Sequence, residues 1–169
     1  MVNGDESFPA MLTAIRGART TITFANFSWE DGEVAREITE ALAERCRAGF
    51  GVNVLVDAIG SRGMPKALGR MLAASGCHFA RYGPAMLHAK TMVVDDQWVS
   101  IGSANLDNAS FALNNELNVT FMDKRLARRL TEIFEQDLRS TTPVSLEEWR
   151  RHAHRHLMYL PLIPLRDQL

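Results

Sequence analysis

The apolar residues of the chain follow two spacings, one with a period near 3.6 residues and one close to strict alternation. In the stretch ITEALAERC, Ile38, Leu42 and Cys46 recur every four residues, as on the buried face of a helix. Capping residues, glycines and prolines bound the segments of this type. The helical spacing predicts helices over residues 7–18, 31–47, 65–75 and 124–139.

Shorter runs rich in Val, Ile, Thr and Phe lie between these helices and have the composition of strands. The run VNVLVD at residues 52–57 is apolar enough for a strand that is buried on both faces. Runs of this type predict strands over residues 20–27, 52–57, 78–81, 88–94, 98–101 and 116–121. Because strands and helices alternate, we expect parallel pairing and an α/β fold, with a mixed central sheet flanked by helices on both faces.

Composition is that of an ordinary globular domain. The chain has 169 residues, 46% of them hydrophobic and 23% charged, which is enough for one sizeable core. We expect a single domain over residues 1–144 and a tail over residues 145–169 that begins as a helix and becomes basic and apolar. Such a tail suits contact with anionic lipid or packing against the domain. No signal-peptide pattern or bilayer-length apolar window is present, so we expect no transmembrane segment.

Net charge, cysteines and histidines give little indication of a nucleic-acid partner, a disulfide or a metal site. A net charge of -1 and a pI near 6.5 give no general attraction to nucleic acid, although a local basic cleft is compatible with them. Cys46 and Cys77 form no pair in sequence and are expected to be buried free thiols. His152 and His156 have a zinc-compatible spacing, but no third ligand is suitably placed. We therefore expect no disulfide, no metal site and no cofactor.

Candidate chemistry is concentrated in residues 88–105, HAKTMVVDDQWVSIGSAN. The period of two in a strand places His88 and Lys90 on one face, so that both side chains point to the same spot. An imidazole can attack phosphorus, and an ammonium can hold phosphoryl oxygens. This pair indicates phosphodiester chemistry.

The rest of this stretch predicts a hairpin that returns to the histidine. Asp95 begins the turn, either as an Asx-turn residue or as a member of the site. After the second strand, Gly102 permits close approach of the backbone to a ligand, and Ser103 and Asn105 supply uncharged donors. We expect Lys90, Gly102, Ser103 and Asn105 to bind phosphate.

Two further segments are candidates for the same site. A carboxylate that accepts a hydrogen bond from His88 would orient the imidazole, and Glu116 is our candidate; the alternative is an edge-strand side chain facing water. Asn114 is a further candidate for the lining. The loop 58–63, which contains Ser61, lies where open α/β sheets bind anions, although a plain connecting loop is the preferred interpretation.

The pattern of residues 88–105 resembles the HKD motif of the phospholipase D superfamily, and every position of that motif is filled. The resemblance implies a phospholipase D-like α/β/α sandwich in which His88 is the nucleophile and forms a covalent phosphohistidine. It also implies that Lys90, Ser103 and Asn105 bind the phosphoryl group. Asp95 is more a turn and scaffold residue in this family, and we keep it as a catalytic candidate only on the strength of the motif.

Within the superfamily, two blocks resemble bacterial cardiolipin synthases. The block from NGDESFPAMLTAIRGA to VLVDAIGSRG is similar to the opening of their first catalytic half. The block from MLHAKTMVV to TPVSLEEWR is similar to the end of their second half. The first motif is missing near residues 81–85, so the chain resembles a shortened member. Ala109 replaces an arginine that is usual there, which is expected to weaken phosphate or head-group affinity.

A covalent route at phosphorus needs a nucleophile on one side and a general acid on the other. The chain provides one motif, and His78 has no lysine two residues after it. We therefore expect a homodimer that pairs two copies of His88 across a two-fold axis, similar to single-motif members of the superfamily.

The resemblance implies a phosphatidyltransferase of the cardiolipin synthase type that acts on phosphatidylglycerol. Alternatives are a phospholipase D with water as acceptor, a dimeric phosphodiesterase or endonuclease, and an inactive remnant that binds a lipid surface. The synthase-like flanks favour phospholipid and disfavour nucleic acid without excluding it. We expect a bacterial protein on the cytoplasmic side of the inner membrane, in peripheral contact with it.

Overall fold

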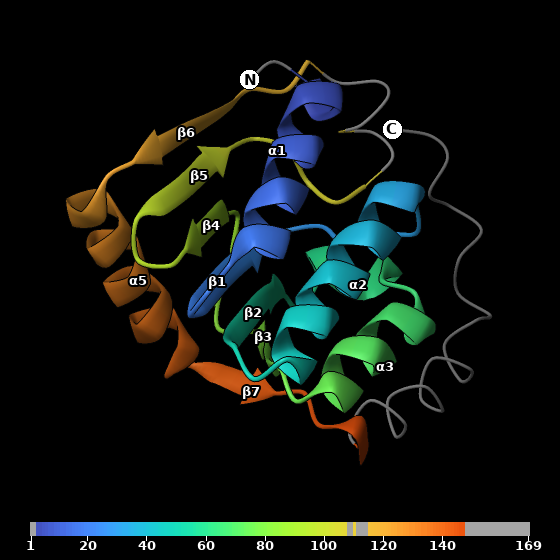
Figure 1. Ribbon diagram of the computed structural model, residues 1–169. Coiled ribbons are helices and arrows are strands. Elements are labelled where there is room, and N and C mark those ends of the chain that lie inside the picture. The colour runs from blue at the N-terminus through green and yellow to red at the C-terminus, as the bar shows by residue number, and fades with distance from the viewer. Residues whose placement is uncertain (1–2, 108–109, 111–114, 148–169) are drawn as a thin grey trace.

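The strands of the described chain form one mixed sheet that carries helices on both faces (Figure 1). The computed structural model describes residues 3–107, 110 and 115–147. Within these residues the sheet has seven strands in the order β6-β5-β4-β1-β2-β3-β7. They are β1 (Thr21–Asn26), β2 (Gly51–Asp57), β3 (His78–Tyr82), β4 (Lys90–Val94), β5 (Trp98–Gly102), β6 (Asn118–Met122) and β7 (Thr141–Pro143). The expected α/β class is confirmed.

The helices are divided between the two faces of this sheet. The described helices are α1 (Asn3–Gly17), α2 (Glu33–Arg47), α3 (Lys66–Ser75) and α5 (Lys124–Leu138), with a 3-10 turn, η1 (Gly60–Gly63), between β2 and α3. On one face α2 lies between α1 and α3, whereas α5 covers β4 and β5 on the other face (Figure 1). The sheet therefore forms the middle layer of a sandwich.

Strand direction changes at the centre of the sheet. β1, β2 and β3 run parallel to one another, as the βαβ pattern requires, and β1 pairs antiparallel with β4 on its other side. Asn26 at the end of β1 therefore pairs with Lys90 at the start of β4. Gly102 at the end of β5 pairs with Asn118 at the start of β6. These four strand ends lie at the same edge of the sheet, which is where the predicted site residues lie.

The alternation of side chains along each strand produces a core on each face of the sheet. Phe24 and Val54 face the larger core, which contains residues of α1, α2 and α3. Leu55 faces the opposite core with Phe134 of α5. Each fully buried side chain of this size contributes about 1.5–3 kcal/mol relative to exposure. Burial on both faces explains the nearly continuous apolar run of β2.

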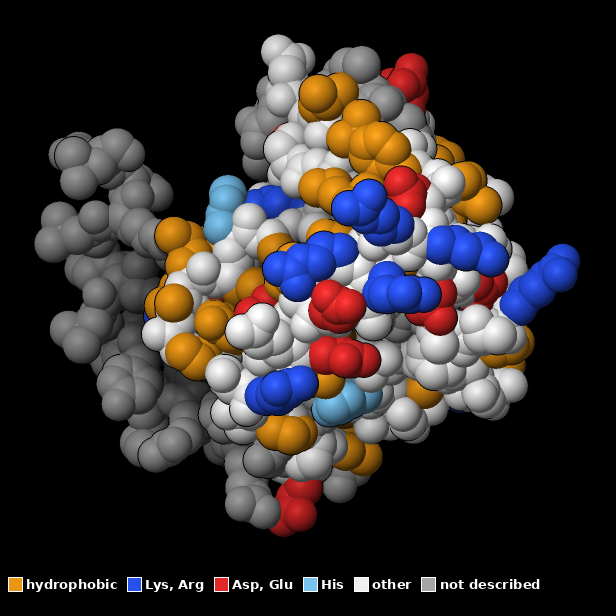
Figure 2. Space-filling view, turned by 90° about the vertical axis from the view of Figure 1, so that its left-hand side faces the viewer, with side chains coloured by type: hydrophobic (Ala, Val, Ile, Leu, Met, Phe, Trp, Pro, Cys, Tyr) orange, Lys and Arg blue, Asp and Glu red, His pale blue; other side chains and the backbone are white. Residues whose placement is uncertain are grey.

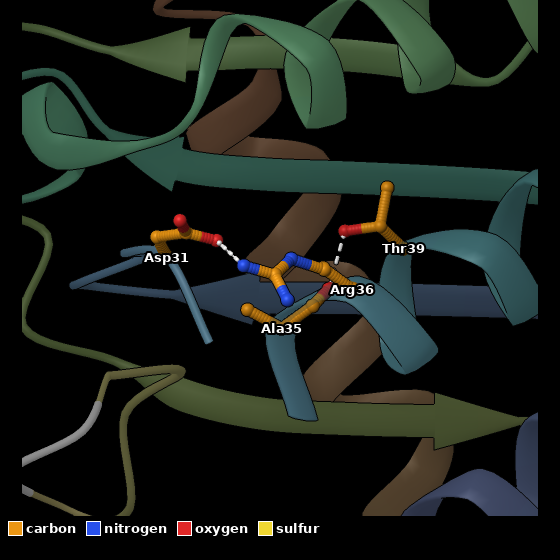
Figure 3. Close-up of polar contacts among 4 residues, drawn as sticks. All are labelled: Asp31, Ala35, Arg36 and Thr39. Atoms are coloured by element: carbon orange, nitrogen blue, oxygen red, sulfur yellow. Dashed lines mark hydrogen bonds and ion pairs between the residues drawn. The ribbon is translucent and has the colours of Figure 1, made fainter. Parts of the chain in front are cut away.

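The start of α2 is joined to the loop that precedes it (Figure 3). The Arg36 guanidinium donates to the Asp31 carboxylate at 2.8 Å, and both side chains are more than half exposed. One turn further on, the buried Thr39 hydroxyl donates to the Ala35 carbonyl at 2.6 Å. The exposed ion pair stabilises little, whereas the second bond satisfies a hydroxyl inside the core.

Element boundaries differ from the predictions at the edge that holds the candidate site. The predicted strand 88–94 begins at Lys90, because β1 ends at Asn26 and offers no partner beyond it. The predicted strand 116–121 begins at Asn118 for the same reason, because its partner β5 ends at Gly102. His88 and Glu116 therefore precede their strands.

β7 was not predicted, because three residues at a sheet edge show no apolar alternation. The next residue, Val144, is buried and its N–H donates to the carbonyl of Phe79 at 2.8 Å. The chain thus packs on the sheet up to the predicted domain boundary. Residues 148–169, including His152 and His156, lie outside the described residues.

Both cysteines are free thiols, and each is half-buried rather than fully buried. The Cys77 thiol accepts from the Ser75 hydroxyl at 3.0 Å and donates to the Leu42 carbonyl at 3.9 Å. Burial raises the pKa of Cys77 to about 12. A thiol in this state is protonated at neutral pH and is a poor nucleophile.

Candidate active site

Lys90 is a buried cation at the start of β4. Its side chain is 7% exposed, and its Nζ atom has no hydrogen-bond partner within the described residues. Burial lowers the pKa of Lys90, while the carboxylates of Glu116 and Asp107 oppose this by favouring the charged form. A buried donor without a partner is costly in a folded protein. Its position suits an anion that supplies the missing acceptors.

His88 lies two residues before Lys90 and is exposed. Its ring meets that of Phe27 in an edge arrangement, with centroids 4.9 Å apart and planes at 63°. The Lys90 ammonium lies 5.1 Å from the centroid of the same Phe27 ring. Both motif side chains therefore contact one aromatic residue, which brings a solvent-accessible imidazole and a buried cation together.

Glu116 lies against Ser103 at the start of β6. The Glu116 side chain is 7% exposed, and its carboxylate accepts a short hydrogen bond from the Ser103 hydroxyl. The Ser103 hydroxyl also accepts from the Leu117 N–H at 3.1 Å. The alternative of a water-facing Glu116 is therefore wrong, whereas its expected hydrogen bond with His88 stays a prediction. Ser103 must turn its hydroxyl proton away from Glu116 before it can donate to a phosphate.

The side-chain amide oxygen of Asn105 is hydrogen-bonded to the backbone after β1. This Oδ1 atom accepts from the Ser28 N–H at 3.4 Å, and the backbone N–H of Asn105 donates to the Ser110 hydroxyl at 3.0 Å. With the oxygen engaged in this way, the amide NH2 is the end that suits a phosphate oxygen. Asn114 and Ala109 lie outside the described residues.

Gly102 has a packing role that the sequence did not reveal. A Cβ atom at this position would collide with the Asn118 side chain and would lie 2.6 Å from the Leu117 carbonyl. The buried Asn118 in turn accepts from the Ala104 N–H at 3.2 Å. Glycine here lets the start of β6 approach the end of β5, which places Glu116 beside Ser103. Its expected contact with phosphate stays a prediction.

Asp95 lies at the other end of β4, roughly 16 Å of strand from Lys90 at about 3.3 Å per residue. Its carboxylate accepts from the backbone of Arg19 and from the backbone and hydroxyl of Thr20, at 2.8–3.0 Å. Burial acts to raise the pKa of Asp95, but these hydrogen bonds outweigh it and hold the pKa below its ordinary value. With Asp96, it occupies the left-handed region at a φ of 53°. The structure does not bring Asp95 to the other site residues, and its contacts are those of the turn residue.

Asp57 was missed by the sequence analysis. It is 1% exposed at the end of β2, and its carboxylate accepts from Ile59 and Gly60 at 2.8 and 2.7 Å. The same carboxylate accepts from the Leu87 N–H at 2.7 Å, immediately before His88. Asp57 thus ties the loop after β2 to the segment that carries the nucleophile candidate. Only its place at the end of a buried strand could have indicated this role.

The described residues provide neither a cluster of metal ligands nor a helix that could span a membrane. No group of three or more His, Cys, Asp or Glu side chains in this part of the chain is arranged to hold a metal ion. Among the same residues, no helix combines the length and apolar character that a bilayer crossing needs.

The curated relatives of the chain are much longer than it is. Cardiolipin synthase 2 of Staphylococcus epidermidis is 38% identical over 80 residues, which cover 47% of this chain and 16% of that protein. The major cardiolipin synthase ClsA of Bacillus subtilis is 32% identical over 117 residues, which cover 66% of this chain and 24% of that protein. The chain therefore corresponds to about a quarter of their length or less.

Solved structures share the fold over most of the chain. The phospholipase D family member Nuc from Salmonella typhimurium superposes with a TM-score of 0.75 at 24% identity, over 86% of this chain and 97% of that one. NucT from Helicobacter pylori gives a TM-score of 0.69 at 18% identity, over 83% and 92% of the two chains. At these identities the likeness shows the fold alone.

A family model described as the PLD-like domain of cardiolipin synthase matches residues 11–138. That match spans more than half of the chain and includes every strand from β1 to β6, the HKD-like motif and Glu116. The chain therefore belongs to the cardiolipin synthase PLD-like domain family.

Proposed function

We propose that the chain is a phosphatidyltransferase of the cardiolipin synthase type that acts on phosphatidylglycerol through a phosphohistidine on His88. One observation carries the proposal: in a domain of this family, the buried Lys90 ammonium has no hydrogen-bond partner among the described residues and lies near the exposed imidazole of His88. The phosphodiester of a phospholipid is an anion whose oxygens can accept hydrogen bonds from the Lys90 ammonium and whose phosphorus the His88 imidazole can attack.

The reaction proceeds in two displacements at phosphorus. The imidazole of His88 attacks the phosphodiester of one phosphatidylglycerol, an N–P bond forms, and the P–O bond to the head-group glycerol breaks. Glycerol leaves after it receives a proton. A hydroxyl of a second phosphatidylglycerol then loses its proton and attacks the phosphohistidine, which yields cardiolipin and restores free His88. Lys90 and the donor groups of Ser103 and Asn105 stabilise the charge on the phosphoryl oxygens in both steps.

Proton transfer to the leaving glycerol requires a second acid–base group. We assign it to His88 of a second copy of the chain in a homodimer, so that each imidazole attacks in one turnover and protonates in another. Glu116 orients an imidazole and balances the positive charge that develops on it. A strict monomer with full activity would contradict this assignment.

Apolar side chains around the site support a lipid substrate. Ile59, Met86 and Leu117 are 67%, 67% and 60% exposed. Asp57 binds the backbone of Ile59 and of Leu87, which follows Met86, and Leu117 follows Glu116. Exposed apolar groups beside a polar site suit contact with acyl chains. These side chains support peripheral contact with a membrane, and we propose that this membrane is a bacterial inner membrane, contacted from its cytoplasmic side.

Labelled phosphatidylglycerol tests the proposal directly. The full chain is incubated with vesicles of this lipid and quenched in alkali, in which phosphohistidine survives. We expect labelled protein and cardiolipin with the wild type, and neither with His88→Ala. His78→Ala is the matched control, because His78 is exposed at the start of β3. Trapped label that persists in His88→Ala would refute the nucleophile, and no label at all would refute the transferase.

Water as acceptor is the second candidate, and the exposure of His88 favours it, because solvent reaches the phosphohistidine. Phosphatidic acid in place of cardiolipin would identify this phospholipase D activity.

A dimeric nuclease receives less support from the surface. On the side that carries α5 and β6, several Lys and Arg side chains gather across the middle of the face, with Asp and Glu side chains among and below them that partly balance their charge (Figure 2). The exposed charged residues of α5 include Lys124, Arg125, Arg128, Arg129, Glu132 and Glu135. Salt-dependent cleavage of DNA in a parallel assay would favour the nuclease, and trapping with neither substrate would favour an inactive remnant that binds lipid.

A further inference from the structure

Phe27 contacts the side chains of both His88 and Lys90, the HKD-like pair, although it lies in a distant part of the sequence. It follows Asn26, the last residue of β1, which pairs with Lys90 across the sheet. Its ring meets the His88 ring edge to face at 4.9 Å and lies 5.1 Å from the Lys90 ammonium. One aromatic ring thus contacts the imidazole and the cation together.

The loop between β2 and α3 fits closely around Phe27. The buried Ser61 donates its hydroxyl to the Phe27 carbonyl at 3.0 Å. A Cβ atom at Gly60 would lie 2.5 Å from that carbonyl and 2.7 Å from the ring, so only glycine fits there. The loop 58–63 therefore has a use beyond connection: it holds the backbone and the ring of Phe27.

The residue after Phe27 is held from the opposite side by the end of the motif. The Ser28 N–H donates to Asn105 Oδ1 at 3.4 Å, and the Ser28 carbonyl accepts from the Leu106 N–H at 3.1 Å. Phe27 is consequently fixed between the loop after β2 and the segment that carries Asn105. A ring held on both sides can restrict the groups that pack against it.

We propose that Phe27 is a positioning residue that sets the relative orientation of the His88 imidazole and the Lys90 ammonium for in-line attack on phosphorus. This inference rests on the proposed function of the same site. The negative face of an aromatic ring attracts a cation without forming a hydrogen bond. Phe27 therefore attracts the ammonium of Lys90 without a lone-pair acceptor, and the N–H groups that point away from the ring are available to the phosphoryl oxygens. The edge contact restricts rotation of the His88 ring.

Three variants separate a requirement for the aromatic ring from a requirement for apolar volume. Phe27→Leu keeps an apolar side chain but removes the ring, and Phe27→Tyr restores a ring. Phe121→Leu is the matched control, because Phe121 is 43% exposed on β6 and is bound to neither motif residue by any described ring contact. Kinetics are measured with phosphatidylglycerol vesicles and normalised to the folded fraction.

We expect kcat of Phe27→Leu to fall about 100-fold, the effect of a misplacement near 1 Å, with KM changed less than about threefold. Phe27→Tyr should recover most of kcat, and Phe121→Leu should match the wild type. A purely structural role would lower thermal stability without changing kcat per folded molecule. That result, or a Tyr variant as slow as the Leu variant, would overturn the proposal.

A second measurement tests the positioning role of Phe27 even if the wild type shows no turnover. The absence of turnover would refute the proposed function without refuting that role. Inorganic phosphate is titrated against the wild type and the same variants, and the His88 ring resonances are followed by NMR. We expect Phe27→Leu to weaken phosphate binding at least about threefold and to reduce the response of the His88 resonances to phosphate, through loss of the oriented ammonium. Unchanged affinity would refute the positioning role whatever the wild type catalyses.

Discussion

Replacing Lys90 by methionine should stabilise the protein and at the same time remove its activity. The ammonium is nearly fully buried and has no hydrogen-bond partner within the described residues. Methionine retains an unbranched apolar stem of similar length, so the packing around the stem is kept while the buried charge is removed. The free energy of unfolding and the catalytic rate are therefore expected to change in opposite directions.

The magnitude follows from two opposing contributions. A buried polar group without a partner costs about 1–3 kcal/mol, and a charged one costs more. Attraction to the Phe27 ring returns about 0.5–2 kcal/mol, and the carboxylates of Glu116 and Asp107 return part of the rest. We expect Lys90→Met to raise the free energy of unfolding by about 1–2 kcal/mol. For a chain of this length that is roughly 2–8 °C in Tm.

Urea unfolding of the wild type and Lys90→Met measures the difference, with Lys124→Met as the control because Lys124 is exposed on α5. The control should differ from the wild type by less than about 0.5 kcal/mol. Cardiolipin formation by Lys90→Met should fall about 100- to 1,000-fold, as when one stabilising donor is lost. A Lys90→Met protein that is less stable than the wild type would refute the reasoning, because the ammonium would then be paired in the folded state.

The stability advantage of Lys90→Met over the wild type should also decrease as the pH rises. Burial lowers the pKa of folded Lys90 below the ordinary 10.5 of the unfolded chain. Between these two values the unfolded state binds more protons, so the stability of the wild type rises with pH in that range. The advantage of Lys90→Met should consequently shrink as the pH approaches 10.5. An advantage that stays constant over alkaline pH would show that the charge of Lys90 is not its cause.

Three further changes test other parts of the structure. Asp95→Asn should lower the free energy of unfolding by about 1–3 kcal/mol at pH 7 and leave activity per folded molecule unchanged. The stability difference from the wild type should vanish as the pH falls through the lowered pKa of Asp95. Urea unfolding at several pH values measures it. Gly102→Ala should reduce stability by at least about 1–3 kcal/mol and activity further, because the new Cβ displaces Asn118 and the start of β6; full activity would contradict this packing role. In Cys46→Ser, the remaining Cys77 thiol, whose pKa burial raises, should react with a disulfide reagent at pH 8 far more slowly than after unfolding. Equal rates would show that the thiol is not buried.

Local spacing in the sequence identified the HKD-like pair, whereas the residues that support the pair through long-range packing were not predicted. The two-residue spacing of His88 and Lys90 led us to expect them on one face, and both do contact Phe27, although β4 begins only at Lys90. Asp57 contacts Leu87 across 30 positions, and Ser28 contacts Asn105 across 77. No periodicity connects residues at such separations, so their contribution to the site was not visible in the sequence. Strand ends were misplaced for the same reason, since a partner strand decides where pairing stops.

The contacts around Phe27 explain why the candidate site depends on the whole domain. His88, Lys90 and Asn105 lie within one short stretch, yet each contacts the segment 26–28 at the end of β1. That segment is held in turn by Ser61 after β2. The parallel strands β1 and β2 must therefore be paired, and the helices over them packed, before the HKD-like residues acquire their relative orientation. An isolated peptide with the same motif would contain the imidazole and the ammonium, but it would lack the Phe27 ring and the buried setting in which Lys90 is held.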